Sequence, residues 1–218
     1  MSAPDAAVEV AGERLRLLGE RAVWWERAGT LVVADLHWGK AATFRASGIP
    51  IPAGTTEADL GRLSAAVART AARRLVILGD LSPARAGRVP RTLGTIAAWR
   101  AAHPDLEVLL VRGNHDRHAG DPPRELGFDV VNGPHPLGPF VLRHEPAISP
   151  DGYVLAGHLH PGVRLHGPGR QSVRLPCFAF GRSVALLPAF SEFTGTAERE
   201  PRDGDRVYII AGDEVIRV

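Results

Sequence analysis

The feature that most constrains the fold is a set of short apolar runs that each end in polar side chains. The first run spans Thr30–Asp35, the second Leu75–Asp80 and the third Val108–Asn114. Each run is rich in Val, Ile and Leu and is too short for a helix, so it predicts a buried strand with a polar residue at its end. A chain that repeats this plan is typical of an α/β fold.

Helical patterns separate these predicted strands. Residues 55–72 place Leu60, Leu63 and Val67 at helical spacing, which predicts an amphipathic helix after the first strand. Residues 92–103 repeat the pattern until Pro104 interrupts it. The N-terminal half therefore alternates strand, helix, strand, helix and strand.

Beyond residue 120 the pattern changes to short β-like runs punctuated by Gly and Pro, which predict a second sheet. These runs are Phe128–Val131, Phe140–Arg143, Tyr153–Ala156, Val163–His166, Val173–Leu175, Val184–Leu187, Val207–Ile210 and Val215–Val218. Because the candidate site residues come from both halves, we expect one domain over residues 1–218 without a separate cap domain.

Composition limits the kind of protein. No apolar run approaches the ~20 residues of a membrane span, and the N-terminal residues lack a secretory signal, so we expect a cytoplasmic protein without a membrane partner. The single cysteine, Cys177, excludes an intrachain disulfide and a thiolate zinc cluster. A metal would therefore bind His, Asp, Glu or Asn. The net charge of +2 is only a weak hint of a polyanionic partner.

Oxygen and imidazole side chains follow five predicted strands. The blocks are Asp35-Leu36-His37, Gly79-Asp80, Gly113-Asn114-His115-Asp116, His144 alone and Gly157-His158-Leu159-His160. A single Asp at a strand end is more often a capping residue, but side chains at several strand ends converge on one edge of an α/β sheet. Imidazole and carboxylate together favour Mn, Fe, Ni or Zn over Mg or Ca.

These blocks, in this order, resemble the calcineurin-like metallophosphoesterases, whose pattern is D-x-H, G-D, G-N-H-D/E, a lone His and G-H-x-H. The resemblance implies an α/β/β/α fold, with two mixed β-sheets sandwiched between helices. It also implies two divalent metal ions, manganese first, bridged by Asp80. One ion would be held by Asp35, His37, Asp80 and His160, and the other by Asp80, Asn114, His144 and His158.

The same resemblance implies a mechanism. A metal-bridging hydroxide would attack phosphorus, and His115 would protonate the leaving oxygen as a general acid. Asp116 would orient His115 through a hydrogen bond.

Further segments resemble the compact bacterial PdeM family of ligase-associated DNA-damage-response endonucleases. They are Asp35–Lys40, Phe44–Pro52, Arg174–Phe180 and Leu187–Gly195. The family implies a nuclease or phosphodiesterase that acts on DNA in repair, in association with a DNA ligase, a helicase and an exonuclease. The alternative is a small-molecule phosphodiesterase acting on cyclic nucleotides or nucleotide-sugar diphosphates. A catalytically inactive scaffold is disfavoured because every ligand position is filled.

Four residues near the blocks are candidate substrate contacts. Trp38, Lys40 and Arg45 follow the first block, and aromatic and cationic side chains together suit a nucleic-acid backbone. Arg112 precedes Gly113 and could fork a phosphate oxygen. Core packing of Trp38 and a salt bridge for Arg112 are the open alternatives. The oligomeric state is also open, with a homodimer through an edge strand such as Val207–Ile210 as one hypothesis.

Overall fold

The apolar runs of the N-terminal half form the parallel centre of a seven-stranded sheet. These strands are Thr30–Val33 (β4), Arg74–Ile77 (β5), Glu107–Val111 (β6) and Asp129–Val131 (β7). The computed structural model describes residues 5–52, 54–199 and 202–218. Val32 and Val76 face one hydrophobic core and Leu31 and Leu75 face another. Both faces of the centre are covered, which is why these runs are continuously apolar.

Three antiparallel strands that the sequence did not predict extend this sheet. They are Ala6–Val10 (β1), Glu13–Leu18 (β2) and Ala22–Trp25 (β3), and the order across the sheet is β1 to β7. The two-residue loop between β1 and β2 has φ of 50° at Ala11 and 78° at Gly12. Positive φ at both positions is the geometry of the tight hairpin turns that match strand twist.

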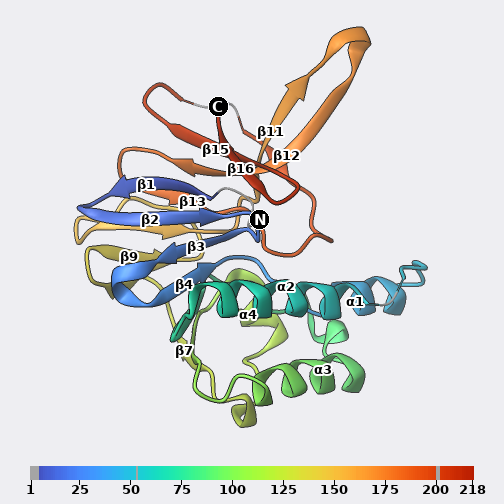
Figure 1. Ribbon diagram of the computed structural model, residues 1–218. Helices are drawn as coiled ribbons and strands as arrows, with labels where there is room; N and C mark the ends of the chain where they lie inside the picture. Colours follow the sequence, from blue (N-terminus) through green and yellow to red (C-terminus); the bar gives the residue numbers. More distant parts are fainter. Residues whose placement is uncertain (1–4, 53, 200–201) are drawn as a thin grey trace.

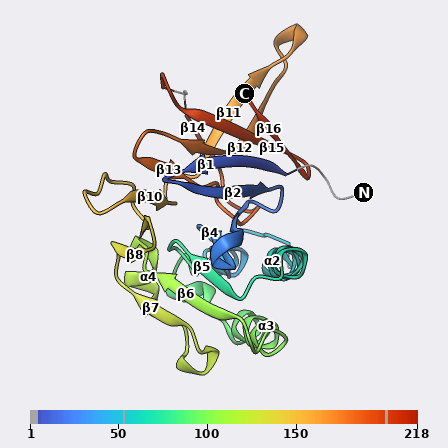
Figure 2. The same cartoon turned by 60° about the vertical axis from the view of Figure 1, so that its left-hand side comes forward.

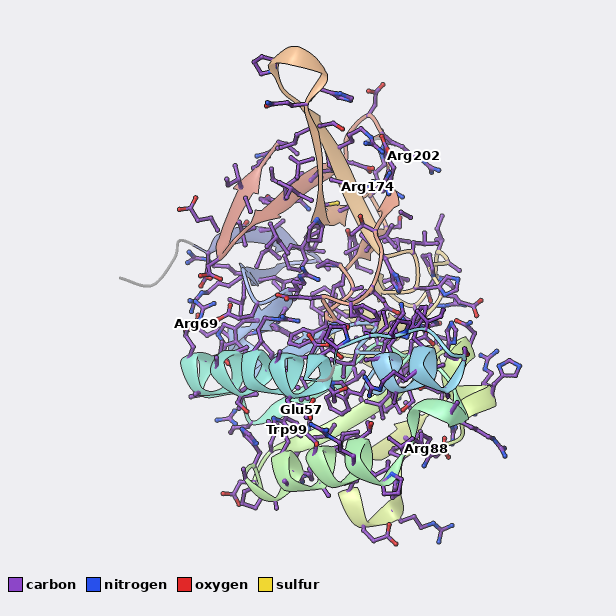
Figure 3. The ribbon with its side chains drawn as sticks, turned by 90° about the vertical axis from the view of Figure 1, so that its right-hand side faces the viewer. Glu57, Arg69, Arg88, Trp99, Arg174 and Arg202 are labelled. Carbon is purple, nitrogen blue, oxygen red and sulfur yellow. The ribbon has the colours of Figure 1, made fainter. Side chains whose placement is uncertain are left out.

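Helices cover the face of the first sheet that points away from the second. They are Lys40–Ala46 (α1), Thr55–Thr70 (α2) and Pro90–Ala101 (α3), with the short Asn114–Ala119 (α4) near the strand ends (Figure 1). Leu60 and Leu63 of α2 pack in the core beneath the sheet. Trp99 of α3 lies towards α2, where its indole donates a hydrogen bond of 3.0 Å to the Ser64 hydroxyl (Figure 3). The predicted helices therefore form at α2 and α3.

The C-terminal half forms the second sheet. Its strands are His135–Leu137 (β8), Phe140–Arg143 (β9), Tyr153–Ala156 (β10), Pro161–His166 (β11), Ser172–Phe180 (β12), Val184–Leu186 (β13), Ala197–Glu198 (β14), Arg206–Ala211 (β15) and Glu214–Arg217 (β16). β10 pairs in parallel with β9 and β13, whereas β12 is antiparallel to its neighbours, so this sheet is also mixed. β1 and β2 of the first sheet lie beside the second sheet (Figure 2). Val8 and Leu17 of the first sheet belong to the same hydrophobic core as Phe178 and Tyr208 of the second.

The outer side of the second sheet has a hydrophobic cluster of its own. Val154, Cys177 and Ile209 form a buried cluster there, and Val163 and Leu165 of β11 pack against it. The β11–β12 hairpin extends beyond the sheet (Figure 1). The two mixed sheets and the α/β class are confirmed. Within the part of the chain that the structure describes, the α-helices lie on the side of the first sheet (Figure 1). No helix among these residues is both long and apolar enough to cross a membrane.

Candidate metal centre

The seven predicted ligands lie at one edge of the molecule because five strands end there. Asp35 and His37 follow β4, Asp80 follows β5, Asn114 follows β6, His144 follows β9, and His158 and His160 follow β10. The chain continues to pair beyond the strands: the amide of His37 donates to the Asp80 carbonyl at 2.9 Å, and that of Gly157 to the His144 carbonyl at 3.1 Å. The ends of the two sheets therefore meet at a single site.

Asp35, His37 and His160 form the first group of candidate ligands, with ligand atoms that all lie within 4.8 Å of one another. The two Nε2 atoms of His37 and His160 are 3.4 Å apart. The Asp35 Oδ1 atom is 3.6 Å from His160 Nε2. One carboxylate and two imidazoles thus point at a common position.

Asp80, His144 and His158 form the second group, again within 4.8 Å. His158 Nδ1 lies 3.0 Å from His144 Nε2. Asn114 joins this group, because its Oδ1 atom is 2.8 Å from the same His144 nitrogen. The sequence resemblance assigned these four residues to one ion.

Asp80 lies between the two groups. Its Oδ1 atom is 3.4 Å from His144 Nε2, and its Oδ2 atom is 3.9 Å from His37 Nε2. One carboxylate oxygen therefore faces each group, which is the arrangement that a bridging ligand requires.

The polar atoms of the centre fit a cation. Asp35 Oδ1 is buried and makes no hydrogen bond with a described residue, a costly state for a carboxylate unless a positive charge lies beside it. Burial lowers the pKa of His37 to about 3, against the opposing effect of Asp80. Metals bind the neutral imidazole. Burial acts in the same direction on His144, but Asp80 and Asp35 outweigh it and raise the His144 pKa to about 9. The carboxylates thus draw a positive charge into the site.

The backbone is strained where it presents the ligands. φ is 55° at Asp35, 45° at His37, 52° at Asp80, 71° at His158 and 45° at His160. Non-glycine residues seldom adopt this left-handed region, and such strain is concentrated at functional sites.

Three glycines explain why most of the blocks begin with Gly. A Cβ atom on Gly79 would collide with the His144 ring, and one on Gly113 with the Asp80 carboxylate. A Cβ on Gly157 would lie 2.6 Å from Asp35 Oδ2. Each glycine allows the backbone before one ligand to approach a ligand from another strand.

His115 lies at the mouth of the centre, with 45% of its side chain exposed. Its amide donates to Asp80 Oδ1 at 3.0 Å. Its ring Nδ1 lies 2.8 Å from the Pro83 carbonyl oxygen, and its Nε2 is 3.9 Å from Asp80 Oδ2. A ring held at Nδ1 by a carbonyl keeps Nε2 free towards the site.

Asp116 does not bond the His115 ring, so the expectation of a direct hydrogen bond is wrong. The Asp116 carboxylate accepts hydrogen bonds from the amides of Gly113 at 2.9 Å and Ser82 at 3.3 Å. Burial raises its pKa, although these two bonds act in the opposite direction. Asp116 thus ties the loop after β5 to the turn that carries Asn114 and His115.

Three of the four candidate substrate contacts have structural partners. Trp38 is 1% exposed and packs edge-on against Trp99, so its assignment to the mouth of the site is wrong. Arg112 forms a two-pronged ion pair with Asp121 at 2.7 Å. The Arg45 guanidinium donates to the Ile51 carbonyl at 3.1 Å.

Lys40 is the exception. It is half-buried at the first turn of α1, and its ammonium makes no hydrogen bond or ion pair with a described residue. Burial lowers its pKa, whereas the charges of Asp35 and Asp80 act to raise it. The ammonium therefore lies close enough to interact with both carboxylates.

Backbone carbonyls also contact the ligand rings, and no sequence pattern indicates which carbonyls do so. His144 Nδ1 lies 2.9 Å from the Leu78 carbonyl, and His160 Nδ1 lies 3.3 Å from the Gly195 carbonyl. Such contacts fix the tautomer and the orientation of ligand rings. Any residue can supply a carbonyl, so only the fold reveals which one does.

Comparison with protein-family models found no match, and neither did comparison with curated proteins. Among solved structures, the crystal structure of the Pseudomonas putida nuclease MPE is similar with a TM-score of 0.87 and 43% identity, covering 99% of this chain and 100% of that chain. The E. coli phosphoesterase Yfce matches with 16% identity over 84% of this chain and 87% of its own, at a TM-score of 0.36 that carries no weight. The full-length match to nuclease MPE shows that the chain belongs to the calcineurin-like metallophosphoesterase family of metal-dependent phosphoesterases.

Proposed function

We propose that this single-domain protein is a dinuclear, manganese-dependent phosphodiesterase that cuts DNA. Its proposed role is in DNA repair, in association with a DNA ligase, a helicase and an exonuclease. The observation that carries the proposal is 43% identity to a nuclease over the whole chain. The convergence of both ligand groups at one edge supports the same activity.

In this proposal the two ligand groups hold one ion each. The first ion would be held by Asp35, His37 and His160 and the second by Asn114, His144 and His158, and Asp80 would serve both. Two such ions supply Lewis-acid stabilisation of the phosphate and an activated water near neutral pH. The low pKa of His37 keeps its ring in the neutral form that binds metal.

His115 is the proposed general acid. Because its Nδ1–H is held by the Pro83 carbonyl, the proton that it exchanges is the one on Nε2, on the side of Asp80. The imidazolium donates that proton to the leaving oxygen, a step that typically contributes ~10²–10⁴ in rate. Asp116 is a positioning residue, since it holds the Gly113 and Ser82 amides beside this turn.

Lys40 is the remaining cation of the site. Its unpaired ammonium, near Asp35 and Asp80, is placed to attract the anionic diester and to hold it in the centre. An ammonium acts there as a point charge without the fixed fork of a guanidinium.

The test is a cleavage panel. Manganese-loaded protein is incubated with plasmid DNA, short single strands and bis-p-nitrophenyl phosphate, with Asp80→Asn as the inactive control. Hydrolysis of all three substrates is expected. Turnover of bis-p-nitrophenyl phosphate alone would contradict the DNA substrate and favour the small-molecule alternative. No turnover at all by metal-loaded protein would contradict the enzymatic proposal.

A further inference from the structure

A polar hollow opens beside the second ligand group. It is lined by Arg112, Arg117, Gly133, Arg143, His144 and Glu145. Because His144 belongs to both the hollow and the ligand group, the hollow borders the candidate metal centre. Any extended substrate that leaves the centre on this side passes these side chains.

The three arginines of the hollow are not equivalent. Arg112 is held by Asp121, and its third nitrogen donates to the Asn132 side chain at 3.0 Å. The guanidinium groups of Arg117 in α4 and Arg143 in β9 make no hydrogen bond or ion pair with any described residue. Two unpaired guanidiniums therefore meet in one hollow from two different elements.

Two unpaired guanidinium groups in one hollow form a favourable binding site for an anion. The guanidinium fork matches phosphate geometry, and such charge-assisted bonds are about twice as strong as neutral ones. Glu145 is the one acid among the lining residues, and it leaves the arginines in excess. A nucleic-acid strand carries its next phosphate beside the one being cut.

We infer that Arg117 and Arg143 form a subsite for the phosphate next to the scissile one, on the side of the second metal group. This inference rests on the proposed function, because it needs phosphodiester hydrolysis at the centre. It deepens that function by giving the substrate a direction: the strand runs from the metal centre past His144 into the hollow. Substrates with a second phosphate are preferred over isolated diesters.

The test uses chromogenic substrates that do not depend on DNA cleavage. p-Nitrophenyl esters of thymidine monophosphate are compared with and without a second phosphate on the far hydroxyl, in both the 3′ and 5′ series. In one series the wild type should prefer the doubly phosphorylated ester by about tenfold in kcat/KM. In the Arg117→Ala/Arg143→Ala double variant this ratio should fall towards one.

Arg14→Ala is the matched control. Arg14 is exposed and lies near the start of β2, at the end of the sheet opposite the ligands, because β2 and β3 run antiparallel to one another and β3 to β4. This variant also removes an arginine charge, but away from the hollow, so the preference for the doubly phosphorylated ester should be unchanged. A ratio that persists in the double variant would overturn the subsite, as would a wild type without a preference.

A second measurement needs no turnover. Binding of fluorescein-labelled hexathymidylate is followed by anisotropy over a range of salt concentrations. The slope of log affinity against log salt should be flatter in the double variant by about 0.7 for the lost phosphate contact. Equal slopes would refute the subsite. Failure of the proposed function looks different, since plasmid DNA then stays intact while the preference among the chromogenic esters remains.

Discussion

At the scale of single residues, the glycines before the ligands are as specific as the ligands. Gly113 stands where a Cβ atom would meet the Asp80 carboxylate. Gly113→Ala should therefore displace the bridging ligand and reduce metal affinity and activity by about 10–100-fold. Metal content after gel filtration and the rate on bis-p-nitrophenyl phosphate check this.

Gly94→Ala is the control for that substitution. Gly94 lies within α3 with nothing within 4 Å of an added Cβ. Alanine is favoured over glycine there by up to ~1 kcal/mol, so stability should rise slightly and metal content should stay the same. Full metal binding by the Gly113 variant would show that the backbone yields easily.

His115→Ala separates metal binding from proton transfer. Both metals should remain, and turnover of DNA should fall by roughly 10²–10⁴ because the general acid is lost. The loss on bis-p-nitrophenyl phosphate should be much smaller, since p-nitrophenolate leaves without protonation. Equal losses on both substrates, or loss of metal, would contradict the general-acid role. Exposed His166, at the end of β11 that lies away from His160, provides the control His166→Ala.

The sequence predicted which side chains gather at this edge better than it predicted their hydrogen-bond partners. The order of the blocks from Asp35 to His160 is a chemical pattern that is visible without the fold. The sequence does not show that Trp38 is buried against Trp99 or that Arg112 pairs with Asp121, because both contacts depend on how the chain folds. The Pro83 carbonyl that holds His115 has no side-chain signature at all.

At the scale of elements, β4, β5 and β6 were predicted from their aliphatic runs, whereas the N-terminal strands β1, β2 and β3 were not. β4, β5 and β6 are buried on both faces, whereas β1 and β2 alternate buried and exposed residues and carry charged side chains. β12 was predicted over Val173–Leu175, but the strand begins one residue before this run and ends five residues beyond it. Its length follows from pairing with β11, β13 and β15, and these partners could not be read from the local sequence.

The outer cover of β12 can be tested through Cys177. Its side chain is fully buried, and burial raises the pKa of the thiol to about 12, although Arg199 acts to lower it. At pH 8 the native thiol stays protonated and inaccessible, so it should not react with Ellman's reagent until denaturant unfolds the chain.

The matched control for that test lies on the same strand. Val173 of β12 is 50% exposed, so Val173→Cys in a Cys177→Ala background should react at once. Fast labelling of native wild type would show that the packing over Cys177 opens readily.

At the scale of the whole molecule, the candidate metal centre lies where the two sheets meet. Asp35, His37, Asp80 and Asn114 come from the first sheet, and His144, His158 and His160 from the second, so an ion bound at either group is shared between the halves. The unfolded chain has no such site. Binding that is confined to the native state stabilises it by a free energy that grows with the logarithm of the ligand excess over Kd.

Metal removal should therefore lower the stability of the entire fold in one transition. At metal concentrations of about 100 Kd the stabilisation is ~2.7 kcal/mol, and for a chain of this size each kcal/mol shifts Tm by about 2–4 °C. Differential scanning calorimetry with manganese and then with EDTA should show a fall of roughly 5–11 °C. Asp80→Asn should show little shift, because the carboxylate that serves both groups is gone. An unchanged wild-type Tm in EDTA, with the metal shown to be removed, would contradict this prediction. It would mean that packing between the sheets alone fixes their arrangement, with the ligands in place before metal binds.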